Sequence, residues 1–137
     1  MIEFKDIHKK YGKLEVLKGV NFTIKDGGII AILGPNGSGK TTSMKSFLGM
    51  VVPTKGDILF NGKSIKGQWA YREQISYLPQ IANFPSNLKV KELISMIKNI
   101  KKVPCNDQEL IELFGLQKHL NKSLGNLSGG TKQKVNL

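Results

Sequence analysis

The chain has 137 residues, of which 39% are hydrophobic and 23% are charged; this fits one compact domain and excludes a disordered tail and a fibrous repeat. Its net charge is +11, yet Arg72 is the only arginine, so nucleic acid, which favours the guanidinium fork, is not an expected partner. Cys105 is the only cysteine, which excludes an internal disulfide.

The sequence contains no segment that predicts a membrane span. Its longest aliphatic run, Ile29–Leu33, is far shorter than the roughly 20 residues that cross a bilayer. Charged side chains at Glu3, Lys5 and Asp6 stand where a signal peptide would need its apolar stretch. These features predict a cytoplasmic protein.

The first part of the chain predicts β-strands. Ile2 and Phe4 alternate with charged residues, and apolar and polar residues also alternate along Val20–Ile24, with the period of half-buried strands. Ile58–Phe60 is followed by Asn61-Gly62, a sequence typical of a hairpin turn.

Two further segments predict strands that are buried on both faces. Ile29–Leu33 is a continuous β-branched run, and Ile75–Leu78 is a second short run that ends at Pro79. Between them, Thr41–Gly49 has helical periodicity. The apolar face of this helix is predicted to consist of Met44, Phe47 and Leu48.

From about Ser86 onward the hydrophobic period becomes helical. The first predicted helix ends before Pro104, and its buried stripe is Val90, Leu93, Ile94, Ile97 and Ile100. A second helix is predicted from Asn106, with Glu109 at capping-box spacing, to Gly115. Its buried side chains are expected to be Leu110, Ile111 and Phe114. A β-rich portion, 1–80, is therefore followed by a helical portion, 81–137.

A phosphate-binding loop joins the predicted strand Ile29–Leu33 to the helix that follows it. Gly34–Thr41 matches the pattern G-x-x-x-x-G-K-[ST], and its place between strand and helix disfavours an ordinary glycine-rich turn. Glycines let backbone N–H groups surround phosphate oxygens, Lys40 is expected to reach the β- and γ-phosphates, and the Thr41 hydroxyl should ligate Mg²⁺. The predicted nucleotide-binding residues are Gly34, Pro35, Asn36, Gly37, Ser38, Gly39, Lys40, Thr41 and Thr42.

Three more motifs lie around this loop in a fixed order. Leu127-Ser128-Gly129-Gly130-Thr131 resembles the signature LSGGQ, Tyr77-Leu78-Pro79-Gln80 resembles a strand that ends in a Q-loop glutamine, and Tyr11-Gly12 stands where an adenine-stacking aromatic is placed. With them, the chain resembles the ATP-binding subunit of an ABC transporter over its whole length. Thr131 departs from the usual glutamine of the signature.

The resemblance implies an α/β fold, the ABC-type P-loop NTPase, with a mixed sheet, an antiparallel N-terminal β portion and a helical subdomain. It implies that ATP and Mg²⁺ bind, that Tyr11 stacks on adenine, and that Gln80 senses the γ-phosphate and the metal. Ser128, Gly129 and Gly130 would contact ATP held by the opposite subunit of a homodimer. A transmembrane permease would dock near residues 81–88 and hold the protein at the inner face of the membrane.

Hydrolysis in this family needs a later strand that ends in Asp and is followed by Glu. No Asp or Glu follows Glu112, and Asp26 and Asp57 lie in glycine-flanked turns, so neither can serve. We therefore expect the chain to be the N-terminal part of a longer ATPase. Its 137 residues would bind ATP without hydrolysing it.

Three other classes of protein share some of these features. A repair or condensin-like ATPase would carry long heptads between Lys40 and Ser128, and none are present. A soluble ABC-superfamily ATPase acting on ribosomes or nucleic acid stays open, because its second ATP-binding domain would follow Leu137. A basic binding module without nucleotide is disfavoured by the loop. Within the ABC family, the sequences 81–85 and 128–135 resemble the copper-related transporter of nitrous oxide reductase maturation.

The family places the later, metal-binding strand between the two predicted buried strands. Without it, Ile29–Leu33 and Ile75–Leu78 would present unpaired backbone edges. We therefore expect the 137-residue chain by itself to be partly unfolded, to aggregate, or to exchange strands with a second copy.

Overall fold

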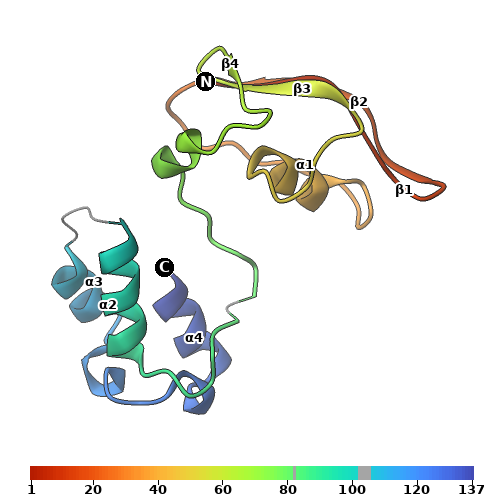
Figure 1. Cartoon of the computed structure of the whole chain (residues 1–137). Coiled ribbons are helices and arrows are strands. Elements are labelled where there is room, and N and C mark those ends of the chain that lie inside the picture. The colour runs from red at the N-terminus through yellow and green to blue at the C-terminus, as the bar shows by residue number, and fades with distance from the viewer. Residues whose placement is uncertain (82, 102–105) are drawn as a thin grey trace. The chain divides into compact units, whose positions relative to one another are not determined.

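The computed structural model describes residues 1–81, 83–101 and 106–137. The chain divides into two compact units, Met1–Ile75 and Ser76–Leu137. The first contains β1 (Ile2–Tyr11), β2 (Leu14–Ile24), α1 (Lys40–Phe47), β3 (Lys55–Phe60), β4 (Lys63–Ser64) and the 3₁₀ turn η1 (Ala70–Gln74) (Figure 1). The second contains α2 (Val90–Lys101), α3 (Asp107–Leu113), η2 (Gln117–His119), η3 (Leu124–Asn126) and α4 (Gly129–Asn136). None of the described helices is long and apolar enough to cross a membrane.

The first unit is built on an antiparallel sheet with the strand order β2-β1-β3-β4. Ile2 pairs with Ile24 and Phe4 with Phe22, and the two phenylalanine rings stack with their centroids 4.1 Å apart. The alternation in the sequence thus predicted the paired ends of β1 and β2 correctly, although β1 extends to Tyr11 and β2 begins at Leu14. The hairpin at Asn61-Gly62 is also confirmed, because β3 turns there into β4.

The core of the first unit lies between the sheet and α1, which covers one face of it (Figure 1). Its buried side chains are Phe4, Ile7, Leu17 and Ile58, and Phe47 of α1 packs against them. The face predicted for α1 was partly wrong, because Ser43 and Ser46 are its buried residues and Met44 is exposed. The Ser46 hydroxyl donates to the Thr42 carbonyl at 2.8 Å, which satisfies this buried polar group.

The two predicted parallel strands are not formed. Neither Ile29–Leu33 nor Ile75–Leu78 forms a strand, and both lie outside the described sheet. A parallel strand exists only through a ladder of hydrogen bonds to a neighbouring strand, and the strands of the described sheet include neither segment. As a consequence Ile29 is fully exposed and Leu33 is 88% exposed.

The second unit is organised around the start of α2. The Val90 and Lys91 N–H groups donate to the carbonyls of Lys122 and Leu120, at 3.2 and 3.0 Å. The Glu92 carboxylate accepts from the Lys89 N–H at 2.8 Å, as in a capping box. These bonds satisfy helix-end donors that have no partner within the helix. They fix the loop around Leu120 against α2.

The core of this unit is made by two segments far apart in sequence. Val90 and Leu93 of α2 pack against Leu124 and Leu127. The predicted stripe of α2 is therefore buried in its first turns only, since Ile97 is exposed and Ile100 is 71% exposed. The end of the helix predicted at Pro104 lies outside the described residues.

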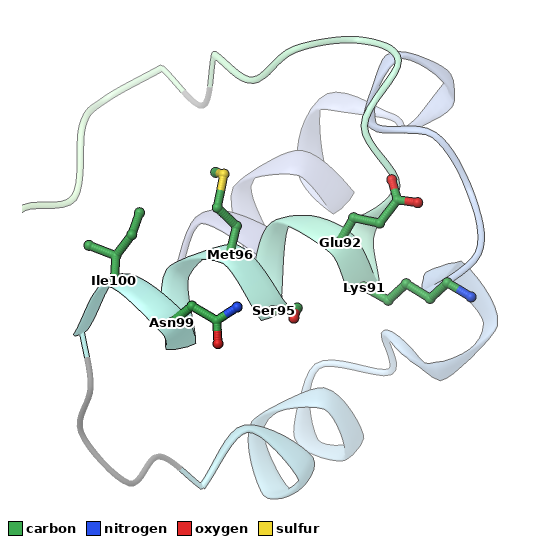
Figure 2. A pocket seen from close by; sticks show the side chains of 6 residues that line it. All are labelled: Lys91, Glu92, Ser95, Met96, Asn99 and Ile100. Atoms are coloured by element: carbon green, nitrogen blue, oxygen red, sulfur yellow. The ribbon is translucent and has the colours of Figure 1, made fainter.

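A surface pocket lies along the exposed side of α2. Figure 2 shows that Met96 and Ile100 leave the helix in the same direction. The pocket is lined by Lys91, Glu92, Ser95, Met96, Asn99 and Ile100. The predicted burial along α3 was also wrong in part: α3 has no fully buried residue and Leu110 is exposed, although Asn106 does bond Glu109 at its start.

The exposed run at 29–33 predicts self-association. We expect the 137-residue chain expressed by itself to form oligomers at micromolar concentration, because apolar side chains and unpaired backbone groups there invite pairing with another chain. The double variant Ile29→Lys/Leu33→Lys should shift the chain toward monomer in analytical ultracentrifugation.

The matched control is Leu14→Lys, which charges an exposed leucine in a strand that is already paired. It should leave the oligomers unchanged. A wild-type chain that stays monomeric and melts cooperatively would contradict the expectation.

Candidate functional site

The phosphate-loop sequence, Gly34–Thr41, leads directly into α1. Lys40 is the first residue of the helix, and its ammonium turns back over the loop. Nζ donates to the Gly34 carbonyl at 2.7 Å and to the Pro35 carbonyl at 2.8 Å. The Ser38 N–H also donates to the Pro35 carbonyl, at 3.2 Å, and closes a turn. The loop therefore holds its single cation close to its own backbone.

Gly39, the N-cap of α1, fixes where this helix begins. Its φ of +90° is unfavourable for any residue with a β-carbon. A β-carbon added there would lie 2.6 Å from Leu17 Cδ2 and 3.1 Å from the Val16 carbonyl oxygen. The helix start thus lies directly against β2, and only glycine allows that approach.

The first turn of α1 has the properties of an anion site. Its first backbone bond runs from the Ser43 N–H to the Gly39 carbonyl at 2.8 Å. The N–H groups before Ser43 have no acceptor one turn back, and the helix dipole adds partial positive charge. With the Lys40 ammonium at the same end, these groups fit the phosphates of a nucleotide.

The predicted Mg²⁺ site would be formed by the bound nucleotide as well as by the protein. Thr41 is exposed at the start of α1, so its hydroxyl is accessible to a phosphate-bound cation. Among the described residues no group of three or more His, Cys, Asp or Glu side chains is placed to hold a metal ion. A cation here would therefore depend on phosphate oxygens and water for most of its ligands.

Tyr11 is the last residue of β1, beside the two-residue turn at Gly12-Lys13. Its side chain is 49% exposed, and the Lys9 ammonium lies 5.0 Å from the ring centroid. An exposed flat ring with a cation beside it suits stacking on a base. The exposure is compatible with the adenine contact predicted for Tyr11.

The signature segment lies in the second unit, at the start of α4. Ser128 is the N-cap of this helix, and its Oγ accepts from the Thr131 N–H at 3.3 Å. Gly129 and Gly130 form the exposed first turn. The Thr131 hydroxyl lies 2.9 Å from the Ser128 hydroxyl, a contact that the sequence motif did not predict. Thr131, which departs from the signature, therefore bonds the serine at its centre.

Gln80 also lies in the second unit and is exposed. The preceding residue, Pro79, is hydrogen-bonded to α4, because Asn136 Nδ2 donates to the Pro79 carbonyl at 3.2 Å. Nothing in the sequence pattern pointed to Asn136, since one asparagine in a helix carries no such signal. This bond ties the start of the predicted Q-loop to the helix that carries the signature.

The model of the family described as ABC transporter matches residues 17–137. The chain belongs to the ABC transporter family, as one of its ATP-binding domains. A curated relative, the spermidine/putrescine import ATP-binding protein PotA of Clostridium novyi, is 34% identical over 98% of this chain and 40% of its own length. The chain therefore spans well under half of this relative.

Two solved structures share the fold. The ATP-binding subunit of an ABC transporter superposes with a TM-score of 0.86 at 29% identity, over 98% of this chain and 59% of that one. A bacterial ABC transporter cassette solved as a dimer gives 0.82 at 25% identity, over 99% and 67%. The predicted ABC-type P-loop NTPase fold is thus confirmed for the part of the domain present. The copper-related subfamily finds no support in these relatives.

The close approach at Gly39 predicts a specific loss of stability. Gly39→Ala should lower the free energy of unfolding by about 2–4 kcal/mol, because it adds backbone strain and a clash with Leu17. Urea unfolding would measure the change.

Gly37→Ala is the matched control. Gly37 has a φ of +84° and nothing within 4 Å of an added β-carbon, so the variant introduces strain without a clash and should cost about 1–2 kcal/mol. Equal losses in the two variants would show that Gly39 is not limited by contact with β2.

Proposed function

We propose that this protein is the ATP-binding component of an ABC transporter and binds Mg-ATP through Gly34–Thr42. The observation that carries the proposal is the first turn of α1, where N–H groups without a helical acceptor and the Lys40 ammonium meet at one end of a helix. Tyr11 is proposed to stack on adenine, and Thr41 and Gln80 to contact Mg²⁺. The family match spans the loop, Thr41 and Gln80, and the exposure of the Tyr11 ring supports its assignment.

Phosphate binding requires Lys40 to exchange its partners. The ammonium now donates to two neutral carbonyls, at 2.7 and 2.8 Å. A carbonyl oxygen is an uncharged acceptor, whereas a β- or γ-phosphate oxygen carries negative charge and adds Coulomb attraction to the hydrogen bond. The exchange therefore favours the bound state and orients the lysine toward the terminal phosphate.

Two copies of the protein are proposed to hold two ATP molecules between them. Each ATP would lie between one phosphate loop and the Ser128–Gly130 segment of the opposite copy. Support comes from the exposed start of α4 and from the related cassette that was solved as a dimer. A helix N-terminus with an N-cap hydroxyl suits the γ-phosphate of ATP.

A membrane-embedded permease is the proposed second partner, and it would keep the protein at the inner face of the membrane. The segment 81–88, proposed to meet it, begins with an exposed Ile81. The same unit exposes Met96 and Ile100 at the pocket of Figure 2. Exposed apolar side chains of this kind are frequent at protein interfaces.

Hydrolysis is proposed for the whole protein by family resemblance. The acidic residues that the reaction uses in this family are not found in the printed sequence, which has no Asp or Glu after Glu112. The 137 residues are therefore proposed to supply ATP binding, positioning and subunit pairing.

The first test removes the cation of the loop. In the whole protein, Lys40→Ala should weaken Mg-ATP binding by about 10- to 100-fold, or roughly 1.5–3 kcal/mol, because one charge-assisted contact is lost. Isothermal titration calorimetry would measure the Kd. Lys45→Ala, an exposed lysine in the last turn of α1, is the control and should bind normally. Equal affinity of Lys40→Ala and the wild type would refute the assignment.

The second test concerns the signature. In a hydrolysis-deficient version of the whole protein, Ser128→Arg should abolish ATP-dependent dimerisation, because the long side chain would fill the space proposed for the γ-phosphate. Size-exclusion chromatography with light scattering would follow the dimer. Asn126→Arg, at the exposed end of η3, is the control and should still dimerise. Intact dimerisation of Ser128→Arg would exclude the proposed sandwich.

A further inference from the structure

The first unit also contains a cavity that has no role in the proposed ATP binding. It lies at the end of α1 opposite the phosphate loop, and its walls come from residues 49–54, the start of β3 and residues 65–72. Its volume is about 380 Å³, within the range of roughly 300–1,000 Å³ typical of small-molecule sites. Val51, Pro53 and Ile65 give it an apolar lining.

One wall of the cavity carries the only arginine of the chain. Arg72 donates through one terminal nitrogen to the Gly49 carbonyl at 3.2 Å. Its guanidinium carbon lies 4.5 Å from the Trp69 ring centroid and 5.8 Å from that of Tyr71. Tyr71 is itself held, because its hydroxyl donates to the Phe47 carbonyl at 2.7 Å. The guanidinium is therefore fixed in place at the edge of the cavity.

The guanidinium has a hydrogen-bond donor that is not used. Arg72 Nε is buried and has no partner among the described residues. Buried polar groups are nearly always hydrogen-bonded, and a donor left without an acceptor destabilises the fold. A carboxylate is the natural acceptor, since its two oxygens match the fork of a guanidinium. Trp69, whose ring lies against the guanidinium, is 67% exposed.

The charges around the cavity favour an anion. Lys55, Lys66 and Arg72 line it, with Asp57 as the one acidic side chain. Lys55 is also paired with Asp6 at 2.8 Å, and this hydrogen bond raises the pKa of Lys55. Asp57 accepts from the Ser64 hydroxyl at 2.7 Å. Lys66, at the rim, is exposed and carries no ion pair among the described residues.

We propose that this cavity binds a small carboxylate with an apolar body, such as a medium-chain fatty acid. The carboxylate accepts from Arg72, with Lys66 adding attraction at the rim, and the hydrocarbon lies against the apolar walls. The site is separate from the phosphate loop, so ligand binding does not require ATP. Because the proposal does not depend on the assigned transport role, each can fail without the other.

The test uses the fluorescence of Trp69, the only tryptophan of the printed sequence, in a preparation of the whole protein. A Trp69→Phe variant supplies the background to subtract. Octanoate should change the Trp69 emission with a Kd below about 1 mM, whereas octylammonium and octanol should bind at least about tenfold more weakly. Calorimetry on the same samples gives an independent Kd.

Two variants identify the residues that bind. Arg72→Lys keeps the positive charge but removes the planar guanidinium that can donate two parallel hydrogen bonds to a carboxylate. It should weaken octanoate binding at least about tenfold. Because Arg72 also anchors Gly49, Lys66→Glu is the second variant; it lies on the surface and should weaken binding several-fold without affecting folding. Lys13→Glu makes the same charge change in the β1–β2 turn and should leave the Kd unchanged.

The outcomes separate cleanly. Selective octanoate binding that Lys66→Glu weakens and Lys13→Glu does not would support the proposal. Equal affinity for octanoate and octylammonium, no binding of octanoate at millimolar concentration, or a Kd unaffected by Lys66→Glu would overturn it.

Discussion

The contact between Gly39 and β2 is the constraint on which the phosphate loop depends. Because this glycine meets Leu17 and the Val16 carbonyl with no space for a β-carbon, the start of α1 is held against the most buried part of the sheet. Leu17 belongs to the core with Ile7 and Ile58. The position of the Lys40 ammonium is therefore set by the packing of the first unit and not by the loop alone.

A comparable anchor organises the second unit. The N–H groups at the start of α2 bind the carbonyls of Leu120 and Lys122, and Leu124 packs beneath the same helix. The chain between α3 and α4 is thus held to α2 by backbone bonds and by the core together. Ser128 begins α4 directly after this anchored segment, so the signature starts from a fixed point in its unit.

The sequence predicted the parts whose signals are local. Alternation identified parts of β1 and β2, and the Asn61-Gly62 turn identified the end of β3. The loop pattern placed Lys40 at the start of a helix, where it lies. The sequence-based prediction was wrong where a structure depends on neighbouring strands. Ile29–Leu33 has the composition of a strand, yet a strand needs hydrogen bonds to a neighbouring strand, and the described sheet supplies none for this segment. The burial of Ser43 and the bond from Asn136 to Pro79 are tertiary contacts without a sequence pattern.

The hydroxyls of Ser128 and Thr131 lie 2.9 Å apart, and either of them can donate to the other. Thr131 already gives its N–H to the serine oxygen, and its hydroxyl lies within reach of the same atom. When Thr131 donates that hydroxyl proton too, both lone pairs of Ser128 are occupied and the serine can act only as a donor. An anion arriving at the start of α4 selects this arrangement, because it supplies an acceptor and no donor. In that arrangement Thr131 leaves the Ser128 hydroxyl free to donate, through a hydrogen bond that valine, with the same shape and no oxygen, would not make.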